Sequence, residues 1–156
     1  EGAISQFVET RTLEGENLRR DIIDKLDGMA EMVEFIEVRS PKIIAEYREK
    51  LEEKVRELLA DTQIDDSRIA AEVVIFADKI CTDEEVVRLK SHISHMKDVL
   101  LSDEAGIGRK LDFIAQEMNR EANTILSKAN DLEVSNRGID LKTEIEKVRE
   151  QIQNIE

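Results

Sequence analysis

Residues 18–36, LRRDIIDKLDGMAEMVEFI, contain the pattern that decides the fold of this chain. Apolar side chains recur there every three or four residues and form a narrow seam, which consists of Leu18, Ile22, Leu26, Met29, Val33 and Ile36. A seam with this spacing is typical of helices that pack along their whole length. The stretch therefore predicts a long, coiled-coil-like helix over about residues 4–39 and an all-α protein.

The same spacing continues through the rest of the sequence, and no segment has the alternating pattern of a strand. It predicts five further helices, at about residues 41–61, 66–80, 83–101, 109–130 and 134–155. Because short connections between helices favour antiparallel neighbours, we expect an elongated antiparallel helical bundle or a set of hairpins. The first helix is longer than a compact core needs, so part of it is expected to pack on a partner subunit or on a missing N-terminal part.

Four short stretches are expected to mark the helix ends. Ser40-Pro41 predicts a stop and a restart, because Pro disfavours helix at the preceding residue and suits the first turn of the next helix. A polar stretch from Thr62 to Asp66 predicts the next break. Thr82 and Glu85 have the spacing of a capping box. Asn136-Arg137-Gly138 is a possible interruption of the last helix, since Gly lowers helix stability by about 1 kcal/mol relative to Ala.

Composition and charge exclude several classes of protein. The chain has 36 acidic and 23 basic residues, a net charge of −13, and a single cysteine, Cys81. One cysteine cannot form an internal disulfide or a zinc cluster, so we expect a cytoplasmic protein in which Cys81 is packed against apolar neighbours. No apolar run approaches the length of a membrane span. The chain opens with Glu1-Gly2 rather than Met, and we expect it to be a piece of a longer protein. Residues 1–105 are interpreted as a long-helix oligomerisation region and 106–156 as a C-terminal helical pair, together one continuous domain.

The helix predicted over 109–130 has two contrasting faces when it is projected at 100° per residue. One is apolar and is expected to be buried: Leu111, Ile114, Ala115, Met118, Ala122, Ile125, Leu126 and Ala129. The other mixes arginines, amides, hydroxyls and one aromatic: Arg109, Asp112, Phe113, Gln116, Arg120, Asn123, Thr124 and Ser127. Arg and amide groups suit phosphates and nucleotide edges, and an exposed Phe can stack on a base. The alternatives are a solvated face and a face between helices.

A second stripe on this helix carries Lys110, Glu117, Glu121 and Lys128. Glu117 and Glu121 are four residues apart, so their carboxylates lie side by side and repel unless a cation lies between them. A divalent metal would serve, with magnesium or manganese preferred by oxygen ligands. An Arg or Lys partner, or plain solvation, explains the pair equally well.

The two histidines, His92 and His95, are neighbours on the helix predicted over 83–101. His92 lies at the edge of the apolar seam and is a candidate general base, metal ligand or hydrogen-bonding core residue. His95 points further from the seam. Gly-rich phosphate loops and the common hydrolase motifs are absent from the sequence.

Several stretches resemble the C-terminal signature of the bacterial YicC-type proteins. These are Gly108–Phe113, Gln116–Thr124, Ser127-Lys128, Arg88–Ile93 and the ending Glu144–Glu156. The resemblance implies an endoribonuclease that uses a divalent metal, preferably manganese, forms hexameric rings and acts on RNA, including small regulatory RNAs. It also implies that a strand-rich N-terminal domain is missing from this chain.

The resemblance directs attention to two groups of candidate residues. The RNA-contacting candidates are Arg109, Lys110, Gln116, Arg120, Asn123 and Lys128, to which residue chemistry adds Phe113. The catalytic candidates are His92, Glu117 and Glu121, of which the two glutamates are also the candidate metal ligands. The rival interpretation is an acidic oligomerisation scaffold, or an adaptor for an RNA-degrading machine, with no catalysis of its own.

Overall fold

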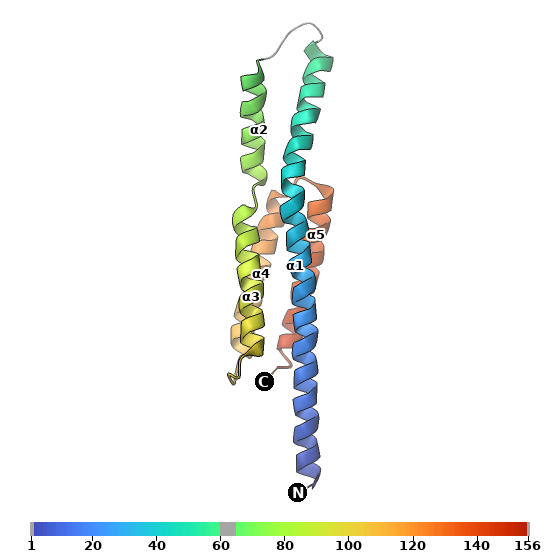
Figure 1. Ribbon diagram of the computed structural model, residues 1–156, viewed down its shortest axis with the longest axis vertical. Coiled ribbons are helices and arrows are strands. Elements are labelled where there is room, and N and C mark those ends of the chain that lie inside the picture. The colour runs from blue at the N-terminus through green and yellow to red at the C-terminus, as the bar shows by residue number, and fades with distance from the viewer. Residues whose placement is uncertain (1, 60–64, 156) are drawn as a thin grey trace.

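The structure, a computed structural model, describes residues 2–59 and 65–155 and is all-α over both ranges (Figure 1). Its helices are α1 (Gly2–Leu59), α2 (Asp66–Ile80), α3 (Asp83–Leu101), α4 (Gly108–Lys128) and α5 (Leu132–Ile152). At 1.5 Å per residue, α1 is roughly 85 Å long. The predicted fold class is confirmed.

The core lies in an antiparallel bundle of four helices. Helix α1 packs on α3 and α5, and α4 packs on α3 and α5, so the four helices close a ring of contacts around a shared apolar core. The predicted seam of α1 lies in this core, where Ile22, Leu26, Met29, Val33 and Ile36 are fully buried. The remaining helix of the described residues, α2, makes its main contacts with α1.

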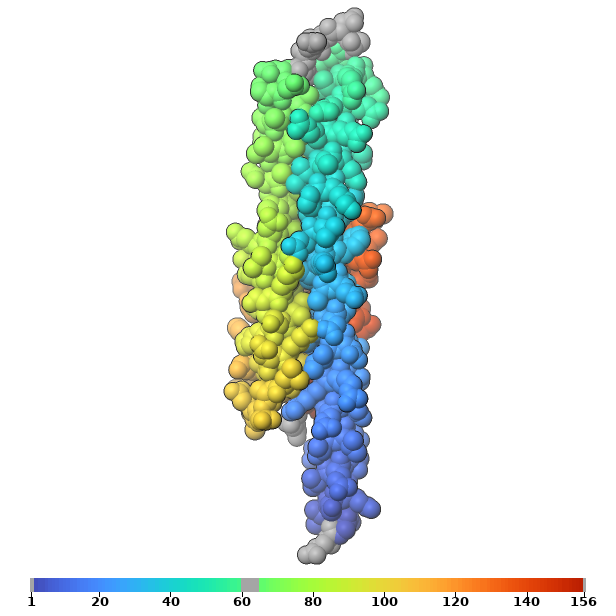
Figure 2. Space-filling model, viewed as in Figure 1, coloured from blue at the N-terminus to red at the C-terminus, as the bar shows by residue number. Residues whose placement is uncertain are grey.

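Both ends of α1 extend beyond the bundle (Figure 2). At one end α1 pairs with α2 in a two-helix arm, where Tyr47 and Phe76 stack with ring centroids 3.8 Å apart. At the other end, every residue from 2 to 14 is exposed. The exposed residues there include the large apolar side chains of Ile4, Phe7, Val8 and Leu13. The expectation that part of α1 needs a partner stays a prediction.

The predicted break at Ser40-Pro41 is wrong, because α1 runs through it without interruption. The Ser40 hydroxyl donates to the Ile36 carbonyl at 2.8 Å, a bond made inside a helix rather than at a cap. Pro41 removes one backbone donor, but the buried positions Ile36 and Ile43 lie on either side of it and hold the helix in the bundle. Packing therefore outweighs the local preference for a break.

An ion-pair network fixes α1 to the start of α5 at this level of the bundle. Arg39 donates to Asp131 at 3.0 and 3.2 Å and to both carboxylate oxygens of Glu46 at 2.8 Å. Asp131 is also the N-cap of α5, where it accepts from the Val134 backbone at 3.1 Å. Hydrogen bonds from Arg39 lower the pKa of Asp131 and that of Glu46 below their usual range.

The last helix, α5, is also continuous, so the interruption expected at Asn136-Arg137-Gly138 is not found. Gly138 is buried, and a Cβ atom there would lie 2.7 Å from Leu126 Cδ2 on α4. The glycine thus allows close approach of α4 and α5. Arg137 lies over the Phe35 ring of α1, 4.6 Å from its centroid.

Three local predictions fall in the connections. Of the polar stretch Thr62–Asp66, residues 62–64 lie outside the described residues, and Asp65 accepts from the Ser67 backbone at 3.2 Å to cap α2. Cys81 is exposed rather than packed, since it follows α2 in the turn to α3. Thr82 is the N-cap of α3 but makes no side-chain cap bond, so the predicted capping box is not formed.

No described helix is long and apolar enough to cross a membrane.

Candidate functional site on helices α3 and α4

Helix α4 has the two faces that its sequence predicts. Six of the eight positions predicted to be buried are in the core, and Leu126 and Ala129 are partly buried: the six are Leu111, Ile114, Ala115, Met118, Ala122 and Ile125. Ile107 precedes the helix and is also buried. The apolar face is therefore confirmed.

The opposite face of α4 is exposed and is lined by one row of polar and aromatic side chains. We call this row the α4 stripe; it consists of Arg109, Phe113, Gln116, Arg120 and Asn123. Their spacing of four, three, four and three residues places them along one line of the helix. The Phe113 side chain is 63% exposed, and Lys110 is exposed beside the stripe, 3.7 Å from Glu104.

Asp112, the acidic residue next to the stripe, is engaged by its neighbours. The Arg149 Nε atom of α5 donates to Asp112 Oδ1 at 3.2 Å, and Gln116 Nε2 donates to Asp112 Oδ2 at 2.9 Å. The bond to Asp112 raises the pKa of the Arg149 guanidinium. The Asp112 carboxylate is thus paired with Arg149, and Gln116 is held in place on the stripe.

Glu117 and Glu121 each lie beside an arginine. Glu121 is buried, and its Oε1 atom accepts from Arg88 Nε of α3 at 2.8 Å. Glu117 is about one third exposed and lies 3.9 Å from Arg120. The hydrogen bond that Arg88 donates to Glu121 raises the pKa of the Arg88 guanidinium. For Glu121, an arginine partner is the arrangement that the structure contains.

A second buried carboxylate, Glu85, lies on the same interface between α3 and α4. Its Oε1 atom accepts from Lys128 Nζ at 2.9 Å and lies 3.7 Å from Arg88 Nη2. Lys128 also donates to the Cys81 carbonyl at 3.0 Å. Glu85 Oε2 is buried with no hydrogen-bond partner among the described residues. Glu85 thus turns toward α4 instead of capping α3.

The charges around Glu85 compete in setting its ionisation. Burial by itself raises the pKa of Glu85, but the hydrogen bond and the charge of Lys128, with the charge of Arg88, outweigh it. The pKa of Glu85 is therefore lowered, and the group is held as a carboxylate.

His92 occupies the next turn of α3 after Arg88. Because α3 and α4 are antiparallel, the register that pairs Arg88 with Glu121 sets His92 level with Glu117, one turn along each helix. His92 is partly buried and His95 is exposed. We call the group Arg88, His92, Glu117 and Glu121 the α3–α4 face.

Arg88 is the residue of this face that sequence reasoning missed. Its position one helical turn before His92, within the stretch Arg88–Ile93, was a usable signal. Its partner on α4 became evident only once the two helices were placed side by side.

A metal site is not complete in the described part of the chain. No group of three or more His, Cys, Asp or Glu side chains is arranged there to hold a metal ion. The candidate ligands reduce to the two carboxylates of Glu117 and Glu121, and Arg88 already uses one oxygen of Glu121. The predicted metal site therefore depends on the carboxylates of Glu117 and Glu121 alone.

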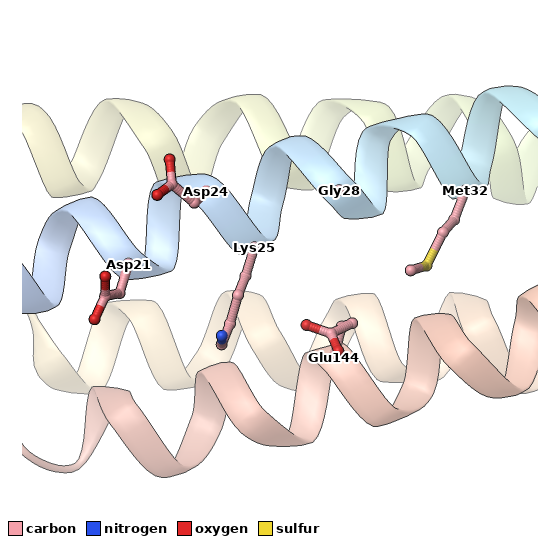
Figure 3. Close-up of a pocket in the computed structure, with 6 residues that line it drawn as sticks. All are labelled: Asp21, Asp24, Lys25, Gly28, Met32 and Glu144. Carbon is pink, nitrogen blue, oxygen red and sulfur yellow. The ribbon is translucent and has the colours of Figure 1, made fainter.

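A hollow on another side of the molecule contains none of the predicted site residues. It lies between α1 and α5, has a volume of about 320 Å³, and is lined by Asp21, Asp24, Lys25, Gly28, Met32 and Glu144 (Figure 3). Lys25 extends from α1 toward α5, where Glu144 lies. The hollow is open, three of its six lining residues are acidic, and it adds nothing to the α3–α4 face.

Comparison with known proteins assigns the chain to a family. Residues 36–156 match the family described as endoribonuclease YicC-like, C-terminal. The chain belongs to this family. As a YicC-like C-terminal region it contains the whole α4 stripe and the whole α3–α4 face within the matched residues, whereas the exposed end of α1, residues 2–14, precedes them.

Two curated relatives cover nearly all of this YicC-like chain. A protein of Clostridioides difficile (strain 630) named probable endoribonuclease YicC is 47% identical over 157 residues, which is 100% of this chain and 53% of the relative. A Haemophilus influenzae protein of the same name is 35% identical over 153 residues, 98% of this chain and 52% of the relative. The chain thus spans about half the length of the relatives it matches.

Proposed function

We propose that this chain is the RNA-contacting and catalytic part of an endoribonuclease. The nuclease class is supported by membership of the YicC-like family and by the names of the two relatives. The observation that carries the site is the α4 stripe, an exposed row with Arg109 and Arg120 on a chain of net charge −13. Cationic forks and amides there would contact phosphates and nucleotide edges.

The α3–α4 face would supply the chemistry beside this RNA contact. His92 is the proposed general base, which would take a proton from the attacking hydroxyl. Arg88 is about half exposed and would offer positive charge to the phosphate as negative charge builds up. Glu121, which accepts a hydrogen bond from Arg88, would hold that side chain in place until a metal binds.

A divalent metal, manganese or magnesium, belongs to the same proposal because the family resemblance implies it. Glu117 and Glu121 are the proposed ligands, and ions of this class are often held by one or two carboxylates together with water and phosphate oxygens. Such an ion would offset phosphate charge when bound. Glu121 would have to release Arg88 to serve as a ligand.

Assembly and substrate range are further parts of the proposal. In a hexameric ring, several α4 stripes would surround one RNA while the acidic parts of the chain face away, which would ease the repulsion expected from a net charge of −13. Small regulatory RNAs are the proposed substrates and the cytoplasm is the proposed location.

The experiment that tests the catalytic site is cleavage of a labelled structured RNA, with manganese and with chelator. We expect cleavage that requires the metal and is lost in Glu117→Gln/Glu121→Gln, because that variant lacks both proposed ligands. Cleavage that persists in a folded variant would contradict the assignment of these residues.

The RNA contact is tested separately by binding. Arg109→Gln/Arg120→Gln is expected to lower affinity and to reduce the slope of log K against log salt by about two, one for each lost phosphate contact. Arg48→Gln/Arg56→Gln, on the arm of α1, makes the same change in net charge away from the stripe and serves as the matched control. Equal effects of both variants would contradict a localised contact.

The second candidate function is an oligomerisation scaffold without catalysis. It is favoured by the exposed apolar residues at the start of α1, Ile4, Phe7 and Val8, and by the engagement of Glu121 and Lys128 in internal ion pairs. Arg120 and Gln116, which a scaffold would bury against protein partners, are exposed in this chain. A chain that assembles but neither binds nor cleaves RNA would support the scaffold.

A further inference from the structure

Phe113 differs from the other three phenylalanines of the chain in having a free ring. Phe7 has the Arg11 guanidinium 5.7 Å from its ring centroid, Phe35 has that of Arg137 at 4.6 Å, and Phe76 stacks on Tyr47. Within the described residues no aromatic or cationic partner covers Phe113, although its side chain is 63% exposed. An aromatic face is therefore open to an external partner.

The side chains around Phe113 are suited to an anionic partner with a planar group. Arg109 lies one turn before it on the α4 stripe and Arg120 two turns after it, about 16 Å apart along the axis. Asp112, the neighbouring carboxylate, is paired with Arg149 at 3.2 Å, and Glu117 lies 3.9 Å from Arg120. Charge complementarity thus favours a phosphate backbone running along the stripe, with Phe113 between the two cations.

We propose that Phe113 stacks on an unpaired RNA base and makes the α4 stripe selective for single-stranded RNA. The inference rests on the proposed function and deepens it by naming the form of RNA. Bases within a duplex are stacked on each other and unreachable for an aromatic side chain on a helix surface, whereas bases in single strands and loops can be splayed out onto one. The two arginines would bind phosphates in either form, so the selectivity comes from Phe113.

Gln116 adds a polar contact next to the stacked base. Its amide nitrogen donates to Asp112, which leaves its carbonyl oxygen as an acceptor beside Phe113. An exocyclic amino group of the base would be its natural donor.

The test uses the fact that the chain contains no tryptophan. The indole introduced by Phe113→Trp is then the only one in the protein, and its fluorescence should be quenched by an unlabelled single-stranded oligonucleotide and not by the same sequence in a duplex. Anisotropy with labelled RNA measures affinity in parallel. We expect Phe113→Leu to weaken single-strand binding on the order of tenfold and to leave duplex binding unchanged.

Phe7→Leu is the matched control, because Phe7 is also 63% exposed but lies at the far end of α1. It should leave binding to both RNAs unchanged. Arg120→Gln should weaken both RNAs to a similar extent, which separates the phosphate contact from the base contact.

The outcomes distinguish this inference from the function on which it rests. Single-strand binding that is unaltered in Phe113→Leu, or a loss shared equally with the duplex, would overturn the role of Phe113 and leave the RNA contact intact. No binding of either RNA by the unmodified chain would overturn both. A lower sedimenting mass of Phe113→Leu with unchanged RNA affinity would assign the ring to a contact between protein chains.

Discussion

Replacing Lys128 by methionine should destabilise the fold more than its position on the protein surface suggests. Lys128→Met removes the 2.9 Å ion pair to Glu85, a residue only 3% exposed, and leaves its carboxylate buried. Breaking a fully buried pair costs about 3–5 kcal/mol. Arg88 remains 3.7 Å from Glu85, so we expect a cost of about 2 kcal/mol.

Replacing Glu85, the partner of Lys128, should leave the free energy of unfolding nearly unchanged. Glu85→Met removes a buried carboxylate whose Oε2 atom has no partner among the described residues, while Arg88 keeps Glu121 and Lys128 can reach water. Glu85→Met/Lys128→Met should then recover most of the free energy of unfolding lost in Lys128→Met. The pair would show a coupling free energy of about 2 kcal/mol.

Urea unfolding followed by far-ultraviolet circular dichroism at one protein concentration measures all four chains. The loss in Lys128→Met corresponds to a fall in melting temperature of about 4–8 °C. The reasoning is refuted if Lys128→Met and Glu85→Met cost the same, or if the double variant is as unstable as Lys128→Met. The double variant also allows the predicted RNA contact of Lys128 to be tested in a chain of restored stability.

Three further predictions concern the ion pair of Arg39 and two glycines inside helices. Arg39 lowers the pKa of Asp131, so the ionised pair stabilises the fold above the unfolded-state pKa of about 4. This stabilisation is lost as the pH falls through the lower folded-state pKa. The free energy of unfolding in urea should therefore change less between pH 7 and pH 3 in Arg39→Gln than in the parent chain. Gly28→Ala should raise the free energy of unfolding by about 0.5–1 kcal/mol, since no atom lies within 4 Å of the added Cβ; a loss of stability would contradict this. Gly138→Val should instead lower the melting temperature, because its side chain would collide with Leu126, and an unchanged melting temperature would show that α4 and α5 can move apart freely.

Local sequence rules failed where tertiary contacts opposed them. Ser40-Pro41 carries a strong local stop signal, yet the core on both sides of it keeps α1 continuous. Thr82 and Glu85 have the spacing of a capping box, but Glu85 gains more from Lys128 of another helix than from the start of its own. In each case contacts with segments distant in sequence outweigh a local preference, which is worth about 3 kcal/mol for a proline inside a helix and about 1 kcal/mol for a helix cap.

The sequence predicted only part of the candidate site, because the other part depends on contacts between helices. The α4 stripe lies on a single helix, so the period of 3.6 residues was sufficient to place Phe113 and Arg120 on its exposed face. The α3–α4 face needs two helices, and the pairing of Arg88 with Glu121 depends on their register. Nothing in the spacing of either helix specifies that register.

The sequence by itself determined that this chain is all-α, which residues line most of the core of α1 and α4, and which side of α4 meets solvent. These properties follow from periodicity, which is local to each helix and is enforced by burial of apolar surface. Only the tertiary structure decided that α1 passes through Pro41, that Gly138 brings α5 against α4, and that Arg88 and Lys128 neutralise buried carboxylates. Those outcomes depend on distances between segments far apart in the chain, where close packing and the cost of burying charge select one arrangement.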